Sequence, residues 1–184
     1  MLVALGVVFL AELGDKSQLI ALTFAVRGRP VAVLAGIAVA CMLLQAIAVG
    51  VGAAAREALP DRPLQVAAGV AFFVFAALAL RDDDDAVDAE ARVPRTAMSV
   101  ALAAGGAFFL AELGDKTQLA TLTLASTNGA IGTWIGAVTG EVAADALAVV
   151  LGARVGARVP ERALRFASAG AFVVFGVLLL AGVG

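Results

Sequence analysis

The chain has 184 residues, of which 62% are hydrophobic and 15% are charged, and its net charge at pH 7 is -2. Soluble domains are about 45–50% apolar, so this composition excludes an ordinary soluble protein and predicts an integral membrane protein. The chain has no histidine and one cysteine, which excludes an internal disulfide and means that any bound metal must be held by oxygen atoms.

Six apolar segments follow one another along the chain, each close to the ~20 residues that cross a bilayer as a helix. They span residues 2–26, 31–54, 64–80, 98–125, 130–153 and 164–183. The alternating pattern of a transmembrane barrel is absent. We therefore predict an all-α membrane protein with six transmembrane helices.

The second half of the chain repeats the first at an offset of 100 residues, without a gap. The matched pairs include Gly36 with Gly136, Phe72 with Phe172, and Phe75 with Phe175. Such self-similarity indicates an internal duplication. Because each half holds three crossings, we expect the halves to be inverted-topology three-helix repeats, as in secondary transporters. The repeats are residues 1–80 and 97–184, and residues 81–96 form an acidic linker between them.

The arginines predict the orientation of these helices. With six crossings, nine arginines fall on one side of the membrane, and the other side holds Arg56 and Arg62. The nine are Arg27, Arg29, Arg81, Arg92, Arg95, Arg154, Arg158, Arg162 and Arg165. Since basic residues concentrate on the cytoplasmic side, we expect the linker to be cytoplasmic and both termini to lie outside a bacterial inner membrane.

Each repeat carries the same charged heptapeptide inside its first apolar segment, Glu12 to Gln18 and Glu112 to Gln118. The shared pattern is Glu-x-Gly-Asp-Lys-Ser/Thr-Gln. Ionisable side chains in a membrane cost about 2.5–3.5 kcal/mol each on insertion scales, so they indicate an ion or proton pathway. Glu12 lies about ten residues into its segment, roughly half way across a ~30 Å hydrocarbon core.

The residue types of the two motifs favour a divalent cation. On a continuous helix Glu12 and Asp15 are neighbours at i and i+3, with Gln18 on the same side, and Gly14 allows local unwinding that frees carbonyl oxygens. Carboxylate, amide and hydroxyl oxygens are ligands suited to Ca²⁺, Mn²⁺ or Mg²⁺. The predicted metal ligands are Glu12, Asp15, Gln18, Glu112, Asp115 and Gln118, with Ser17 and Thr117 as auxiliary hydroxyls.

Lys16 and Lys116 leave two interpretations open. Each is either a tethered cation that neutralises the site between transport events, or a group that orients the carboxylates. A purely structural alternative pairs each lysine with the glutamate four residues before it. We favour a functional site, because one acid per motif is left over and the costly charges are duplicated.

Glu141 and Asp145 lie at i and i+4 in the fifth segment, where the first half has Cys41 and Gln45. They are candidates for a second ion or proton step, and the alternative is the wall of a wet cavity. A stripe of glycines spaced by four in the same segment predicts close helix packing. Its members are Gly132, Gly136 and Gly140.

The two heptapeptides, in paired three-helix halves with an acidic central loop, resemble the GDT-type cation exchangers, a family of manganese and calcium transporters. The resemblance covers essentially the whole chain. It implies export of Mn²⁺ or Ca²⁺ from the cytosol in exchange for protons, with the motif acids as ligands. The expected partners are then divalent metal ions, protons and the lipid bilayer, with no nucleic acid.

We accordingly predict a secondary transporter that works by alternating access, with no resident cofactor and no enzymatic activity. No Walker-type phosphate loop occurs, so direct use of ATP is not supported. An exporter of amino acids or another small solute remains the main alternative. An intramembrane enzyme is a remote one, because each motif lysine would disturb a pair of catalytic aspartates.

Overall fold

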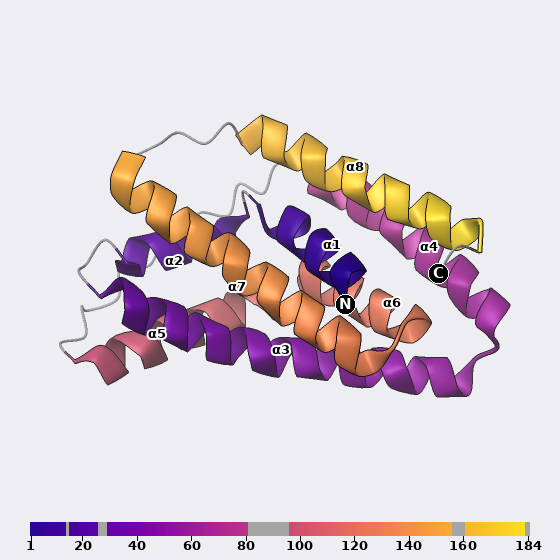
Figure 1. The fold of residues 1–184 in the computed structure, drawn as a ribbon, viewed down its shortest axis with the longest axis horizontal. Helices are drawn as coiled ribbons and strands as arrows, with labels where there is room; N and C mark the ends of the chain where they lie inside the picture. The colour runs from indigo at the N-terminus through magenta and orange to yellow at the C-terminus, as the bar shows by residue number, and fades with distance from the viewer. Residues whose placement is uncertain (14, 26–28, 81–95, 156–160, 183–184) are drawn as a thin grey trace.

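The structure is a computed structural model that describes the whole chain except residues 14, 26–28, 81–95, 156–160 and 183–184 (Figure 1). The described residues form eight α-helices and contain no strand. The helices are α1 (Leu2–Glu12), α2 (Lys16–Ala25), α3 (Pro30–Ala58), α4 (Asp61–Ala79), α5 (Ala97–Glu112), α6 (Lys116–Thr127), α7 (Ala130–Val155) and α8 (Glu161–Leu180).

Two long helices, α3 and α7, lie against each other and run through most of the length of the molecule (Figure 1). Pro30 occupies the first turn of α3, where its missing N–H costs no hydrogen bond. Trp134 of α7 donates a hydrogen bond from Nε1 to the carbonyl of Met42 in α3, over 3.1 Å. These two helices form the scaffold on which α1, α2, α5 and α6 pack.

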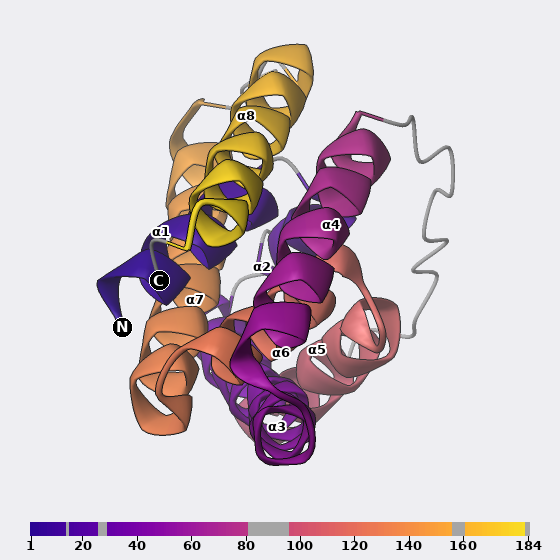
Figure 2. The same ribbon diagram turned by 90° about the vertical axis from the view of Figure 1, so that its right-hand side faces the viewer.

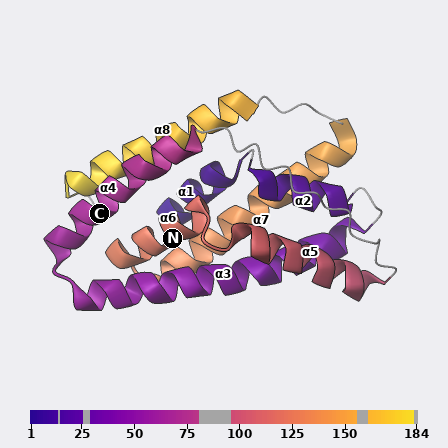
Figure 3. The same ribbon diagram turned by 180° about the vertical axis from the view of Figure 1, so that it is seen from behind.

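The first two helices of each repeat pack on the long helix of the other repeat. Helix α1 lies along α7, and α5 lies along α3 (Figure 3). The glycines of α7 allow this close approach, because a Cβ at Gly136 would overlap the carbonyl of Met1, and one at Gly140 would lie 2.6 Å from the carbonyl of Leu5. The close packing expected from the glycine stripe is therefore confirmed.

The same contact recurs at the offset of 100 residues. A Cβ at Gly36 of α3 would overlap the carbonyl of Ala101 in α5, as one at Gly136 would overlap that of Met1. Gly105 of α5 also faces Gly36, so the two backbones touch. The duplication seen in the sequence thus has a counterpart in the packing.

The third helices of the repeats, α4 and α8, lie side by side (Figure 2). Phenylalanine rings from both helices fill the space between them. Phe72 lies 5.9 Å from Phe172 and 6.2 Å from Phe175, and Phe75 lies 6.0 Å from Phe172, measured between ring centroids. This cluster joins the two repeats at matching positions.

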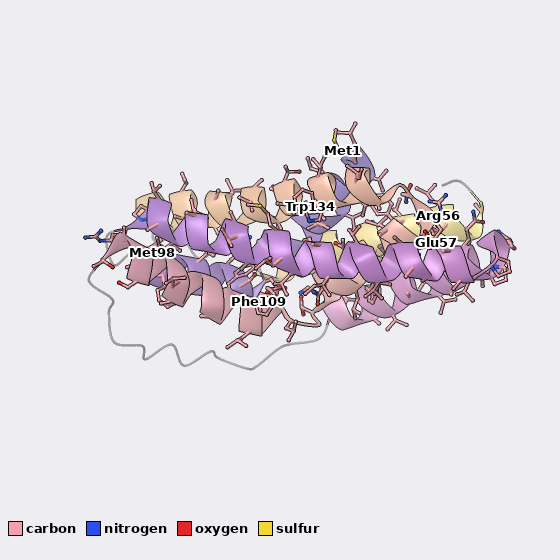
Figure 4. The ribbon with its side chains drawn as sticks, turned by 90° about the horizontal axis from the view of Figure 1, so that it is seen from below. Met1, Arg56, Glu57, Met98, Phe109 and Trp134 are labelled. Carbon is pink, nitrogen blue, oxygen red and sulfur yellow. The ribbon has the colours of Figure 1, made fainter. Side chains whose placement is uncertain are left out.

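The apolar helices support an integral membrane protein, although the number of spans is lower than expected. By length and composition, two described helices are able to cross a membrane, within Pro30–Ala58 and Ala130–Val150. A third span is possible if α5 and α6, which meet at a bend of 71°, count as one. Large apolar side chains such as Leu102 and Ile131 are exposed. Arg56 and Glu57 lie near one end of α3 (Figure 4).

Candidate metal centre

Both heptapeptides break their helix, which corrects the expectation of a continuous helix through each motif. Helix α1 ends at Glu12 and α2 begins at Lys16, with Leu13 in an extended conformation (φ -62°, ψ 116°). The amide of Asp15 donates to the carbonyl of Glu12 over 3.1 Å. Asp15 therefore reaches Glu12 across a turn and not along one face of a helix.

The second motif shows why the break occurs there. Leu113 has φ -63° and ψ 108°, Gly114 has φ +82°, and the amide of Asp115 donates to the carbonyl of Glu112 over 3.0 Å. These values define a type II turn, which needs a positive φ at its third residue and so favours glycine. The local unwinding expected at Gly14 occurs at its counterpart Gly114, while Gly14 itself lies outside the described residues.

The two breaks bring three carboxylates of the predicted ligand set together. Glu12, Asp15 and Glu112 are 0%, 7% and 3% exposed, and one carboxylate oxygen from each lies within 4.8 Å of the others. Among the described residues no other group of three or more such side chains meets this criterion. Asp115 is the fourth acid, with a buried Oδ2 that has no hydrogen-bond partner. Buried carboxylates at this spacing repel one another unless a cation or protons are present.

The hydroxyls of both motifs converge on one of these acids. Ser17 Oγ donates to Glu12 Oε1, and Thr117 Oγ1 donates to Glu12 Oε2 over 3.1 Å. Glu112 differs, because its Oε1 is buried without a hydrogen-bond partner. The two repeats are therefore not equivalent at the centre, and one glutamate is held more firmly than the other.

The motif lysine pairs across the repeats. Lys116 Nζ lies 2.9 Å from Asp15 Oδ2, in an ion pair whose side chains are 16% and 5% exposed. This pairing differs from the purely structural alternative, in which Lys116 would bind Glu112 of its own motif. The Lys16 side chain lies outside the described residues.

The two motif glutamines bind backbone carbonyls at matching positions. Gln18 Nε2 donates to the carbonyl of Ala144 over 3.3 Å, and Gln118 Nε2 donates to that of Leu44 over 3.1 Å. Gln118 Oε1 also accepts from the amide of Gly114 over 2.7 Å. In this conformation Gln118 therefore ties the glycine turn to α3, with both ends of its amide engaged.

Glu141 and Asp145 are fully buried, at 1% and 0% exposure. Gln45 Nε2 donates to Glu141 Oε2, whereas both carboxylate oxygens of Asp145 are without a hydrogen-bond partner. Gln45 was not among the candidate residues predicted from the sequence. The signal that marks it is its offset of 100 residues from Asp145, since an amide and a carboxylate stand at equivalent places.

Comparison with known proteins identifies the family of this chain. The family profile described as "Divalent cation/proton antiporter GDT1" matches residues 1–86 and 100–183, which include both motifs. The chain belongs to the GDT1 family. The resemblance inferred from the two motifs is thereby confirmed, and since GDT1 is a family of transporters, the comparison gives no support to an enzyme.

One curated relative in this comparison is a protein of Vibrio cholerae serotype O1 (strain ATCC 39541) named "Putative manganese exporter". It is 33% identical to this GDT1 member over 136 residues, which cover 72% of this chain and 65% of the relative. The match therefore spans less than two thirds of the relative's length. No solved structure matches the chain.

Proposed function

We propose that this chain exports a divalent cation, Mn²⁺ or Ca²⁺ or both, from the cytosol in exchange for protons. The observation that carries the proposal is the buried meeting of Glu12, Asp15 and Glu112 within 4.8 Å. Hard divalent cations bind carboxylate oxygens, and such a centre inside apolar helices would be costly without a cation to neutralise it. Membership of the GDT1 family and the similarity to a protein named as a manganese exporter support the same conclusion.

In this proposal the four motif acids bind the cation as substrate. Glu12 is held by two hydroxyls, Ser17 and Thr117, which orient its carboxylate toward the neighbouring acids. Lys116 supplies a tethered positive charge that balances Asp15 between transport events and is displaced when the cation arrives. Both ends of the Gln118 amide are engaged in this conformation, so its oxygen reaches the cation only after the helix break rearranges.

We further propose that the chain spans the inner membrane six times, as two inverted repeats. The broken pairs α1 with α2 and α5 with α6 would each make one span, and α3, α4, α7 and α8 the other four. The contacts that recur at the offset of 100 residues support a twofold relation between the repeats. By the arginine distribution, both termini lie outside and residues 81–96 lie in the cytoplasm.

Alternating access follows from this arrangement. The cation enters from the cytoplasm, the two repeats rearrange around the centre, and protons from the outside neutralise the carboxylates and expel it. Broken helices are suited to this role, because their freed backbone groups are tolerated where they line a polar site.

Transport by the purified protein in proteoliposomes tests the proposal. Mn²⁺ and Ca²⁺ are offered separately while internal pH is recorded. Metal flux with opposed proton movement is the expected result, and it ranks the two substrates. Absence of flux for both ions, in protein shown to be folded, would overturn the proposal and favour an exporter of amino acids or another small solute.

Chemical labelling tests the proposed topology. In a Cys41→Ala background, single cysteines are placed at Met98, near the start of α5, and at Glu57, near the end of α3. A membrane-impermeant maleimide should label the first from the cytoplasmic side and the second from the outside. Labelling of both from one side would contradict the proposed six-span topology.

A further inference from the structure

Gln45 and Asp145 occupy equivalent places beside the metal centre. Gln45 lies on α3 and Asp145 on α7, one residue after Leu44 and Ala144, whose carbonyls accept the hydrogen bonds of Gln118 and Gln18. Each residue therefore follows directly the carbonyl at which its long helix accepts a hydrogen bond from the motif of the other repeat. Neither belongs to a heptapeptide.

Both residues carry buried oxygens that no hydrogen bond satisfies. Gln45 Oε1 and both carboxylate oxygens of Asp145 have no partner, although the side chains are 1% and 0% exposed. Glu141 Oε2 accepts from Gln45 Nε2, which fixes the amide and leaves Oε1 as its free end. Since buried polar atoms in proteins are nearly always paired, oxygens left open at equivalent places indicate a ligand.

The charges near Asp145 indicate what kind of ligand. Asp145 interacts electrostatically first with Glu141 and then with Asp15, and it also acts on Glu12 and Glu112, all of them acids. A further buried carboxylate within electrostatic range of the motif acids adds repulsion that a cation would relieve. Three carboxylate oxygens, one each from Glu12, Asp15 and Glu112, also leave coordination positions open on Mn²⁺ or Ca²⁺, which take six or more oxygen ligands.

We infer that Gln45 and Asp145 are a second pair of oxygen ligands for the transported cation, supplied by the long helices α3 and α7. This inference rests on the proposed function. Glu141 acts on the amide of Gln45 and is a positioning residue. The pair is unequal, with a neutral ligand from the first repeat and a charged one from the second.

Direct binding of Mn²⁺ to the purified protein tests the inference, with free Mn²⁺ measured by electron paramagnetic resonance. Asp145→Asn keeps the shape of the side chain and removes its charge, so we expect Mn²⁺ affinity to fall about tenfold or more, equivalent to ~1.4 kcal/mol. Gln45→Leu should weaken binding by a smaller factor. Thr133→Val is the matched control, because Thr133 is also on α7, is 1% exposed and has an unpartnered Oγ1.

A change of metal preference would show that the side chain at position 145 binds the metal and does not only support the structure. In a Cys41→Ala background, Asp145→Cys should lose affinity for Mn²⁺ and gain affinity for Cd²⁺, because a thiolate prefers a soft cation. Thr133→Cys in the same background should change neither. Loss of structure in Asp145→Asn, seen by thermal unfolding, leaves this cysteine exchange as the deciding measurement.

The outcomes distinguish this inference from the proposed function. If Asp145→Asn binds Mn²⁺ within twofold of the unmodified protein while Glu12→Gln does not bind, the ligand pair is wrong and the export proposal stands. If Asp145→Cys shows no gain in Cd²⁺ affinity, the pair is also overturned. If the unmodified protein binds neither Mn²⁺ nor Ca²⁺, both proposals fail.

Discussion

The ammonium of Lys116 lies 2.9 Å from a carboxylate oxygen of Asp15, so the lysine of the second motif neutralises an acid of the first. An ion pair between the repeats makes the charge balance of the centre depend on their relative position. A lysine paired within its own helix would have no such dependence.

Replacement of Lys116 by methionine tests this pairing. The variant breaks the ion pair between Lys116 and the buried Asp15, and breaking a buried pair typically costs about 3–5 kcal/mol. We expect a lower melting temperature in the absence of metal and a larger rise on addition of Mn²⁺ than in the unmodified protein, because bound ligand stabilises the folded state. Lys116→Arg, which retains the charge, is the control. An equal rise in all three proteins would contradict the role of a tethered cation.

Glu12→Gln and Glu112→Gln should each abolish Mn²⁺ uptake into everted vesicles while the protein still inserts in the membrane. Both glutamates are buried among the acids of the centre, and the substitution removes one negative charge with little change of shape. Glu57→Gln is the control, since Glu57 is exposed near the end of α3 (Figure 4). Uptake retained by either motif variant would show that its carboxylate is not a required ligand.

A substitution at Gln118 distinguishes a metal ligand from a residue that only holds the Gly114 turn against α3 by hydrogen bonds. Gln118→Glu keeps an acceptor for the Gly114 amide, but a carboxylate cannot donate to the carbonyl of Leu44. If the hydrogen bond to Leu44 is needed to hold the turn in place, the variant should transport Mn²⁺ several-fold more slowly, despite its extra negative charge. Tighter Mn²⁺ binding with an unchanged or faster rate would instead identify Gln118 as a metal ligand.

Gly114→Ala should lower the free energy of unfolding by about 1–2 kcal/mol, because an alanine is strained at φ +82°. No atom lies within 4 Å of the added Cβ, so backbone strain alone produces the loss. Gly106→Ala within α5 is the control, since that site is equally open and a helical alanine is favoured there. Unfolding by denaturant in detergent measures the free energy of unfolding of both variants. If both substitutions changed it in the same direction, the turn would not depend on glycine.

Substitutions at Gly36 and Gly136 test the close contacts between helices of the two repeats. Gly36→Ala and Gly136→Ala each place a Cβ on a backbone carbonyl of the other repeat, so we expect each to destabilise the fold by about 1–3 kcal/mol. Gly50→Ala on α3 meets no atom within 4 Å and should be neutral or slightly stabilising. Melting temperatures of the three variants give the comparison. A Gly36→Ala protein as stable as Gly50→Ala would show that the crossing tolerates a wider separation.

Sequence patterns predicted the helical segments well where hydrophobicity alone determines them. The segment expected at residues 31–54 is α3, and those expected at 64–80 and 164–183 are α4 and α8. The burial of apolar side chains follows the average hydrophobicity of a segment, which is read directly from the sequence. The predicted linker at residues 81–96 lies almost wholly outside the described residues.

The helix breaks were harder to predict, because they depend on single residues. The apolar runs at 2–26 and 98–125 continue through the motifs, so hydrophobicity indicated one helix where the structure has two. The positive φ of Gly114 and the extended Leu113 decide the break, and neither changes the average hydrophobicity. Gly14 was recognised as a possible point of unwinding, although the convergence of the acids was argued from a continuous helix.

Most contacts between individual residues of the two repeats could not be predicted from the sequence, although the meeting of the two motifs could. The acids Glu12 and Glu112 were predicted to share a centre, and the structure brings them together. The partner of Lys116, however, is 101 positions away in the chain, and Gln45 meets Glu141 across 96. Such pairs depend on how α3, α7 and the broken helices pack, which residue spacing within one helix does not encode.

The hydrogen bond from Trp134 to the carbonyl of Met42 makes Trp134 an intrinsic fluorescence probe of the contact between α7 and α3. The chain has one tryptophan and no tyrosine, so its indole emission comes from this single place between α7 and α3. Sliding of one long helix along the other would remove the indole's acceptor and shift the colour of its fluorescence. Movement of the scaffold during a transport cycle is therefore open to observation in real time, without a dye and without a single substitution.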